Sequence, residues 1–219
     1  MVLFNKWGVI MDSKEYWNMV ANEKKFSTPF QMDLYKKYVS DDKKILDIGC
    51  GYGRILKELY DNGYTNLLGI DFSSEMIKLA NSLYPYINFN ITNGDKLNYE
   101  DNSIDSIILF AVLTCIYDNN SQLNLINEIY RVLKKDGIIY INDFLLNDSD
   151  MYLKRYNDYK DKYNIYGVFE TSDGGIFRHH DIQHLNKLLN NFKCEEVKKL
   201  KYTTMNGHTS NGICYIGRK

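Results

Sequence analysis

Long apolar runs are missing from the 219-residue sequence. A membrane-spanning helix requires about 18 consecutive apolar residues, and no segment approaches that length. The beginning of the chain contains a short apolar piece without a small-residue cleavage site, which argues against a secretory signal peptide. Met11 offers an alternative start that would leave residues 1–10 as an extension. We therefore expect a cytoplasmic protein with no membrane partner.

The sequence also lacks an excess of charge of either sign: its formal net charge is −1. Binding to nucleic acid requires clustered lysine and arginine, whereas the lysine pairs of this chain are scattered. The four cysteines show no CxxC pairing or metal-ligand spacing, which predicts reduced thiols and no metal site. They are Cys50, Cys115, Cys194 and Cys214. We expect neither a nucleic-acid partner nor a bound metal.

What the sequence does contain is ordinary globular composition, with 44% hydrophobic and 25% charged residues. From residue 40 onward, short apolar runs alternate with amphipathic helical stretches, and this rhythm predicts an α/β fold with a parallel sheet and helices on both faces. Strands are expected at 44–49, 66–71, 87–91, 106–113 and 137–143, and helices at 54–62, 73–84, 122–133 and 181–192. Two final apolar stretches around "NGHTSNG" predict a C-terminal antiparallel hairpin.

The segment "ILDIGCGYG", residues 45–53, forms a predicted strand-to-helix turn, and in α/β sheets ligands bind beside such turns. A dinucleotide-binding loop would read GxGxxG, whereas this loop reads GxGxG. Asp47 precedes the first glycine by two residues, where its carboxylate would repel a phosphate and attract a ligand with a free ammonium group. The loop therefore favours a cationic ligand.

These residues resemble the first motif of the Rossmann-like (class I) S-adenosylmethionine-dependent methyltransferases. Further segments are similar to that family's later motifs in the expected order: "LLGIDFSSEMIKLA", "NGDKLNYEDNSIDSIILF" and "LINEIYRVLKKDGIIYIND", the last with Asp136 in place of a glycine. The resemblance implies a seven-stranded, mostly parallel sheet and S-adenosylmethionine as cofactor, with S-adenosylhomocysteine as product. In the family Asp71 would bind the ribose hydroxyls, and Asp95 the adenine amino group.

The resemblance implies a cofactor site made of these residues: Asp47, Gly49, Cys50, Gly51, Gly53, Asp71, Phe72, Met76, Asp95, Lys96, Leu97 and Phe110. An acid at the end of the second strand, about 20 residues past the loop, independently suits a ribose diol. Two alternatives remain open, a nicotinamide-binding domain and a domain that has lost its ligand. The GxGxG spacing with Asp47 argues against the first, and retention of Asp71 and Asp95 argues against the second.

We expect a single domain, residues 1–219, in four parts. Residues 1–39 form a helical segment that in similar enzymes covers the cofactor, and residues 40–146 form the cofactor-binding core. Residues 147–180 are an acceptor-site insertion, and residues 181–219 supply a helix and the final hairpin. The expected activity is methyl transfer to a small-molecule acceptor; a protein or peptide methyltransferase and a non-catalytic cofactor-binding module are the alternatives.

Candidate acceptor residues lie outside the cofactor motifs. Many small-molecule members carry a His-His pair after the fourth strand, where this chain has Thr114 and Cys115. Tyr16 belongs to an apolar N-terminal set that either covers the cofactor or simply packs on the sheet. The segment "GVFETSDGGIFRHH" predicts a hairpin that delivers Arg178 to bind an acceptor carboxylate and His179 to accept a proton. In the plainer interpretation, His180 or Asp181 only caps the next helix.

Five tyrosines recur at steps of three and four between residues 152 and 166, which places them on one helical face. Such a stripe predicts either core packing or a self-association surface, and a self-association surface would make the protein a homodimer. If some rings faced the cofactor, they could instead hold a cationic amine by cation–π attraction. The motifs thus identify the cofactor, and leave open the acceptor, the methylated atom (O, N, S or C) and the use of a general base.

Overall fold

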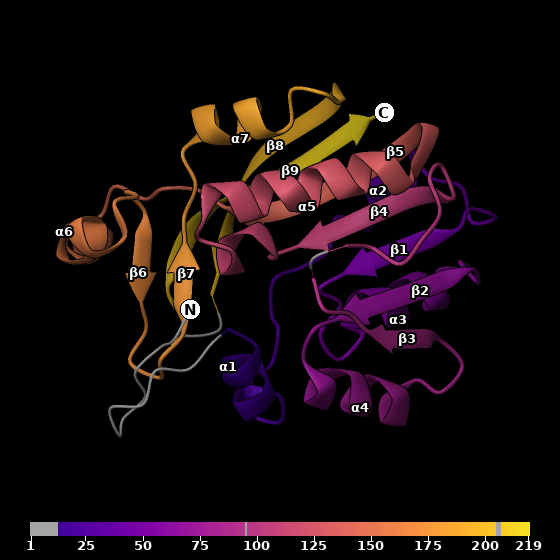
Figure 1. Ribbon diagram of the computed structural model, residues 1–219, viewed down its shortest axis with the longest axis horizontal. Coiled ribbons are helices and arrows are strands. Elements are labelled where there is room, and N and C mark those ends of the chain that lie inside the picture. Colours follow the sequence, from indigo (N-terminus) through magenta and orange to yellow (C-terminus); the bar gives the residue numbers. More distant parts are fainter. Residues whose placement is uncertain (1–12, 95, 205–206) are drawn as a thin grey trace.

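The computed structural model describes residues 13–94, 96–204 and 207–219. Their central feature is a seven-stranded sheet with the order β3-β2-β1-β4-β5-β9-β8 (Figure 1). Its strands are β1 (Ile45–Ile48), β2 (Leu67–Asp71), β3 (Asn88–Ile91), β4 (Ile104–Phe110), β5 (Leu133–Phe144), β8 (Lys193–Thr203) and β9 (Thr209–Arg218). Strands β1 to β5 pair in parallel, and β9 pairs antiparallel with both β5 and β8. The predicted mostly parallel sheet with a C-terminal antiparallel hairpin is confirmed.

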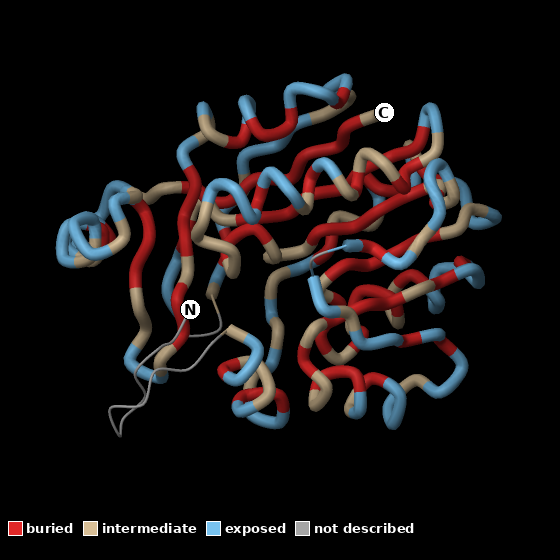
Figure 2. Tube along the Cα trace, viewed as in Figure 1, coloured by how far each residue is buried: buried red, intermediate tan, exposed pale blue. Residues whose placement is uncertain are grey.

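Helices cover both faces of the sheet, as the alternating pattern predicts. One apolar cluster joins the strands to α5 (Asn119–Val132) and α7 (Ile182–Leu188), and a second joins them to α2 (Met32–Tyr35), α3 (Arg54–Asp61) and α4 (Ser74–Leu83). Figure 2 shows the central strands buried along most of their length, while the helices expose their outer faces. Ser73 caps α4 by accepting a hydrogen bond from the Met76 amide, which is the predicted helix start.

Two predicted elements end earlier than expected. The fourth strand stops at Phe110, because Ala111 has a positive φ of 56° and the chain turns into the short 3₁₀ helix η1 (Leu113–Cys115). The helix predicted for 181–192 ends at Leu188. Its capping residue is Asp181, whose side chain accepts from the Gln183 amide, so the plainer interpretation of this position is confirmed.

A small unit follows β5 and stands beside the end of the sheet, at the left of Figure 1. It consists of α6 (Asp150–Tyr163) and the hairpin of β6 (Val168–Glu170) and β7 (Ile176–Arg178), which turns at the predicted "SDGG". Backbone hydrogen bonds from His180 to Phe144 and from Leu146 to His180 join β7's end to β5's end. The hairpin therefore presents its residues at the carboxyl end of β5.

The tyrosine stripe belongs to the core only in part. Tyr152 and Tyr156 on α6 are buried against the β6–β7 hairpin, while Tyr166 lies beyond the helix and is exposed. The helix ends at Tyr163 because Asn164 adopts the left-handed conformation, which takes Tyr166 off the shared face.

The remaining helix, α1 (Ser13–Val20), packs against α4. Asn18 accepts hydrogen bonds from the Ser73 hydroxyl and the Glu75 amide at the start of α4. Over the described ranges, no helix is both long and apolar enough to cross a membrane.

Candidate active site

One large pocket opens at the carboxyl ends of β1, β2, β4 and β5, where ligands bind in open α/β sheets. Most of the predicted cofactor residues line it: Asp47, Gly49, Cys50, Gly51, Asp71, Phe72, Met76 and Phe110. The others do not. Gly53 lies at the start of α3, Leu97 is buried in the core, Lys96 is exposed, and Asp95 lies outside the described residues.

The glycine loop leaves no room for side chains. Gly49 and Gly51 have positive φ angles of 70° and 54°, a backbone conformation that L-residues rarely adopt. A Cβ on Gly49 would lie 2.7 Å from a methyl group of Val112, and a Cβ on Gly51 would lie 2.6 Å from the Phe26 ring. The bare backbone of this loop is therefore available to a ligand that must approach closely.

Asp71 at the end of β2 is held by the loop itself. Its two oxygens accept the amide hydrogens of Gly51, at 2.9 Å, and Ser73, at 2.8 Å. Burial raises the pKa of this carboxyl, and the amide hydrogen bonds partly oppose the rise. Each oxygen retains a lone pair for further donors, which suits the two hydroxyls of a ribose.

Asp47 is the unusual group of this site. Its carboxylate is 1% exposed, and neither oxygen has a hydrogen-bond partner among the described residues. Burial raises its pKa well above the ordinary range, with a further contribution from nearby Asp71. An isolated buried carboxylate is costly unless it is paired, so this position fits a ligand that supplies a cation.

Together, the bare glycine loop, the orphaned Asp47 and the oriented Asp71 fit S-adenosylmethionine. The loop and Asp47 would hold its amino-acid end, and Asp71 its ribose. Met76 and Phe72 line the same part of the pocket, where they offer apolar surface.

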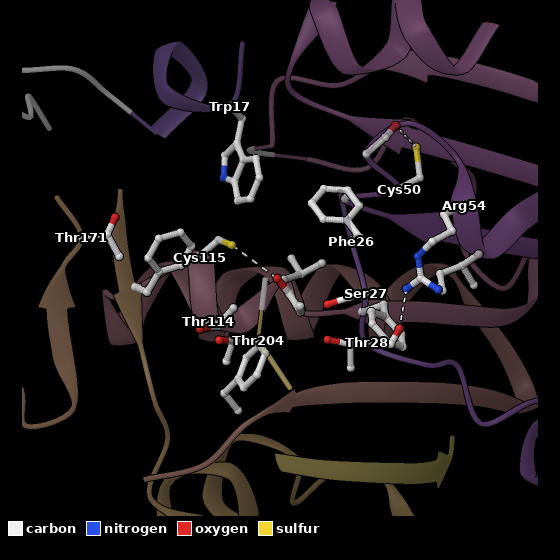
Figure 3. Close-up of a pocket in the computed structure, with 18 of the residues that line it drawn as sticks. Trp17, Phe26, Ser27, Thr28, Cys50, Arg54, Thr114, Cys115, Thr171 and Thr204 are labelled. Atoms are coloured by element: carbon white, nitrogen blue, oxygen red, sulfur yellow. Dashed lines mark hydrogen bonds between the residues drawn. The ribbon is translucent and has the colours of Figure 1, made fainter. Parts of the chain in front are cut away.

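The N-terminal segment covers the pocket from the other side (Figure 3). Trp17 and residues 26–28 contribute to its lining, and the Phe26 ring stacks on Tyr52 of the glycine loop at 4.9 Å between centroids. Arg54 of α3 donates a hydrogen bond to the Thr28 carbonyl, which ties this segment to the cofactor end. The segment thus does more than pack on the sheet, because it forms one wall of the pocket.

The same segment also reaches the β6–β7 hairpin. Tyr16 and Lys24 both donate to the Asp173 carboxylate at the hairpin turn, and Trp17 packs edge-on against Phe177. Tyr16 itself does not line the pocket: its hydroxyl is engaged with Asp173.

The far end of the pocket is mostly aromatic. Phe144, Tyr152, Phe169 and Phe177 line it from β5, α6, β6 and β7, together with Thr114 and Cys115 of η1. Burial raises the pKa of the Cys115 thiol, which makes it a small apolar group here. The Thr114 hydroxyl already donates to the Arg178 carbonyl at 2.8 Å.

Of the two residues predicted to deliver acceptor chemistry, only His179 reaches the pocket. Arg178 is buried on the other side, where its guanidinium donates to the Tyr117 carbonyl and the Asn119 side chain. Successive residues of an extended strand point to opposite sides, so Phe177 and His179 face the pocket while Arg178 between them does not.

His179 is held firmly. Its Nδ1 lies 2.7 Å from the Tyr156 hydroxyl and 3.2 Å from the Asn147 amide nitrogen. Burial, together with the nearby Arg155 charge, lowers its pKa to about 3. The imidazole is therefore neutral at physiological pH.

Arg155 lines this end of the pocket and was not predicted from the sequence. Its only sequence signal is its position on α6, three residues after Tyr152 and on the same side of the helix. Phe144, Phe169 and Phe177 were also missed, because each is brought to the site by tertiary packing of a different element.

Comparisons with known proteins agree with this geometry. A family profile described as a methyltransferase domain matches residues 46–141. The carboxy-S-adenosyl-L-methionine synthase of Nautilia profundicola is 31% identical over 149 residues, covering 65% of this chain and 63% of that protein. A ubiquinone/menaquinone biosynthesis C-methyltransferase of Campylobacter jejuni is 27% identical over 128 residues, covering 56% and 53%. The chain thus spans between about half and two thirds of the length of these curated relatives.

Among solved structures, an S-adenosylmethionine-dependent methyltransferase from Methanosarcina mazei is similar along nearly its whole length. The TM-score is 0.83 at 28% identity, and the match covers 88% of this chain and 99% of that one. The profile match runs from β1 into β5 and includes the predicted cofactor residues. The profile and the solved structure identify residues 46–141 as a methyltransferase domain with the Rossmann-like fold of the S-adenosylmethionine-dependent methyltransferases, and such a domain implies S-adenosylmethionine as the cofactor.

Proposed function

We propose that this protein transfers the methyl group of S-adenosylmethionine to a small molecule with an apolar body. The observation that carries the proposal is the continuity of the pocket, whose cofactor end leads into an aromatic end walled by the N-terminal segment and the β6–β7 hairpin. Pockets that bind small molecules are typically lined by apolar and aromatic side chains with a few placed polar groups.

The cofactor supplies a methyl group already activated on a sulfonium, so the protein's part is to bind, align and exclude water. Asp47 would pair with the ammonium group and Asp71 with the ribose hydroxyls, fixing the cofactor at one end. The aromatic wall would place the acceptor at the other end. Alignment of two bound reactants can contribute about 7–11 kcal/mol to rate acceleration in favourable cases.

A general base is not required by this arrangement. His179 was the candidate, and with a pKa of about 3 it would be a weak proton acceptor at neutral pH. We therefore propose that His179 positions the acceptor rather than deprotonating it. This favours acceptors whose methylated atom is already nucleophilic at neutral pH.

A protein or peptide acceptor would require an open groove. The N-terminal segment lies across that approach, tied to the hairpin by the Lys24–Asp173 ion pair at 2.5 Å and to the glycine loop by the Phe26–Tyr52 stack. These contacts favour the small-molecule alternative. A non-catalytic binding module would share the cofactor end, so turnover is the observation that separates it.

The first experiment is calorimetric titration with S-adenosylhomocysteine, with NAD as the control ligand. We expect micromolar or tighter binding of the first and none of the second. Incubation with S-adenosylmethionine carrying a labelled methyl group and a cell extract, followed by separation by size, then locates the label. Label in the small-molecule fraction supports the proposal, while label on protein, or none despite cofactor binding, contradicts it.

A further inference from the structure

Arg155 differs from the other four arginines of the chain. Arg54, Arg131, Arg178 and Arg218 each donate hydrogen bonds to named oxygens: a carbonyl, a carboxylate or an amide. Arg155 makes no hydrogen bond or ion pair with any residue in the described ranges. Its guanidinium instead lies over two aromatic rings, 4.9 Å from the centroid of Phe169 and 5.5 Å from that of Tyr152.

The two rings hold the Arg155 side chain at the pocket wall while leaving its five N–H donors without an acceptor among the residues that the structure describes. Stacking on aromatic faces orders the side chain in advance, which lowers the entropy lost when a ligand binds. The guanidinium is half-buried, so any charge that meets it is only partly screened by solvent.

His179 adds a second donor. The Asn147 side chain is oriented by its own bonds, because its Oδ1 accepts from the Asn211 amide and its Nδ2 donates to the Leu145 carbonyl. The Tyr156 oxygen accepts from the Asn147 backbone amide, which leaves its own hydrogen for His179. Both neighbours of Nδ1 are thus donors, so this nitrogen is the acceptor and the ring proton is on Nε2.

Nε2 has no partner within the described part of the chain, and His179 lines the pocket. The aromatic end therefore offers two donor groups, a guanidinium and an imidazole N–H, that have no acceptor in the described part of the chain. The described lining residues include only two carboxylates, Asp47 and Asp71, and both belong to the cofactor end. A cationic amine at the aromatic rings is disfavoured, because Arg155 already occupies the faces of Tyr152 and Phe169.

We propose that the methyl acceptor carries an oxyanion, a carboxylate or a phosphate ester, bound by Arg155 and by the Nε2 hydrogen of His179. Its apolar body would lie along Phe144 and Phe177. The planar fork of a guanidinium matches either oxyanion with two parallel hydrogen bonds. This inference rests on the proposed small-molecule methyl transfer and names the class of acceptor.

The test uses three probes of similar size: benzoate, phenyl phosphate and the uncharged benzamide. Each is titrated calorimetrically into the protein saturated with S-adenosylhomocysteine. We expect at least one oxyanion to bind at least tenfold more tightly than benzamide. Equal affinities, or no detectable preference for either oxyanion, would overturn the inference, and the preferred probe distinguishes a carboxylate from a phosphate acceptor.

Arg155→Gln should abolish this preference, while Lys154→Gln, a neighbouring exposed position on the same helix, should preserve it. Both variants should bind S-adenosylhomocysteine like the wild type, which shows that they are folded. Arg155→Lys keeps the charge without the fork and should retain only part of the preference. A preference that survives in Arg155→Gln assigns the oxyanion site elsewhere and contradicts the proposal.

The titrations are repeated without S-adenosylhomocysteine, because failure of cofactor binding would overturn the proposed function on its own. In that case the preference for an oxyanion over benzamide, and its loss in Arg155→Gln, still decides whether Arg155 forms an anion site. The two proposals can therefore fail separately.

Discussion

The two ends of the pocket differ in their ionisable side chains. Where β1 and β2 end, the buried carboxyls of Asp47 and Asp71 line the pocket beside Arg54, whose guanidinium already donates to the Thr28 carbonyl. Where α6 and β7 meet, the guanidinium of Arg155 and the neutral imidazole of His179 line it. The first pair suits a ligand with a positive charge, and the second offers only donors. On the proposed function, one continuous cavity would distinguish the cofactor from the acceptor by charge as well as by shape.

The ends also differ in how the chain builds them. The cofactor end comes from two strand-to-helix turns, each a short continuous segment, and backbone amides orient its carboxylates. The acceptor end is assembled from β5, α6 and the β6–β7 hairpin, and aromatic contacts orient its polar groups. A substitution at the first end should act mainly through local geometry, and one at the second through packing between elements.

Asp143 tests this comparison most strongly, because it is a carboxyl that accepts a hydrogen bond from Thr114 at the aromatic end of the pocket. It is fully buried, accepts the amide hydrogens of Thr114 and Phe144, and has a pKa raised by burial from 3.8 to about 7. A folded-state pKa above the unfolded value means that its contribution to stability is full below about pH 4 and is lost as the pH rises to about 7. The loss is up to about 4 kcal/mol, at 1.36 kcal/mol per unit of pKa.

Urea unfolding of the wild type and of Asp143→Asn between pH 4 and 8 measures this loss. The free energy of unfolding of the variant minus that of the wild type should increase with pH and level off above pH 7. Taking the difference removes the contribution of Asp47 and Asp71, whose pKa values are also raised. A difference independent of pH would show that Asp143 ionises normally and that the acceptor end contains a fixed negative charge.

Gly51→Ala should lower the free energy of unfolding by about 3 kcal/mol. The positive φ costs an L-residue about 1–2 kcal/mol, and the new Cβ would stand 2.6 Å from the Phe26 ring, a displacement that costs about 1–3 kcal/mol. The matched control is Gly63→Ala, where φ is 94° and the nearest atom lies at 3.9 Å. Chemical unfolding and titration with S-adenosylhomocysteine should show a larger loss of stability in Gly51→Ala, and a loss of affinity in that variant alone. Equal losses would mean that Phe26 does not close over the loop.

The contrast between local and tertiary construction also explains what the sequence could predict. Asp47, the loop glycines and Asp71 lie in short contiguous motifs, so their placement in one pocket follows from strand order and turn chemistry. The parallel sheet with its C-terminal hairpin follows from the alternating apolar pattern in the same way, whereas the number of seven strands is what the family resemblance implies. Nothing comparable links Arg155 to Phe169, because their contact depends on how α6 packs on the hairpin.

Arg178 illustrates the limit more sharply. The hairpin containing it was predicted, and the two-residue period of a strand already places Arg178 and His179 on opposite sides. The period alone does not say which side faces the pocket. That choice is made by Tyr117 and Asn119, which provide oxygen acceptors for the Arg178 guanidinium on the far side of η1 and α5.

Asp71→Ala should weaken binding of S-adenosylhomocysteine by about 1.5–3 kcal/mol, roughly a ten- to hundredfold change, the scale of hydrogen bonds to a charged acceptor. The variant removes the acceptor for the Gly51 and Ser73 amides as well as that for the ribose. Calorimetric titration of Asp71→Ala and of the exposed control Asp158→Ala separates this effect from a general change of charge. Unchanged affinity in a folded Asp71→Ala protein would contradict the ribose assignment.

Asp47→Asn should produce the smallest effect on affinity and the most diagnostic result, because stability and affinity should move in opposite directions. The wild-type carboxyl is buried beside Asp71 without a partner among the described residues, so replacing it with an uncharged amide should stabilise the ligand-free protein at neutral pH. The same change removes the counter-charge for an ammonium group and should weaken the binding of S-adenosylhomocysteine by about tenfold. Because burial raises the pKa of Asp47, the gain in stability should increase with pH above about 4, where the carboxyl ionises in the unfolded protein but not in the folded one. Thermal unfolding with and without S-adenosylhomocysteine reads both quantities, and a parallel fall in stability and affinity would show that Asp47 is a structural residue rather than the negative pole of the pocket.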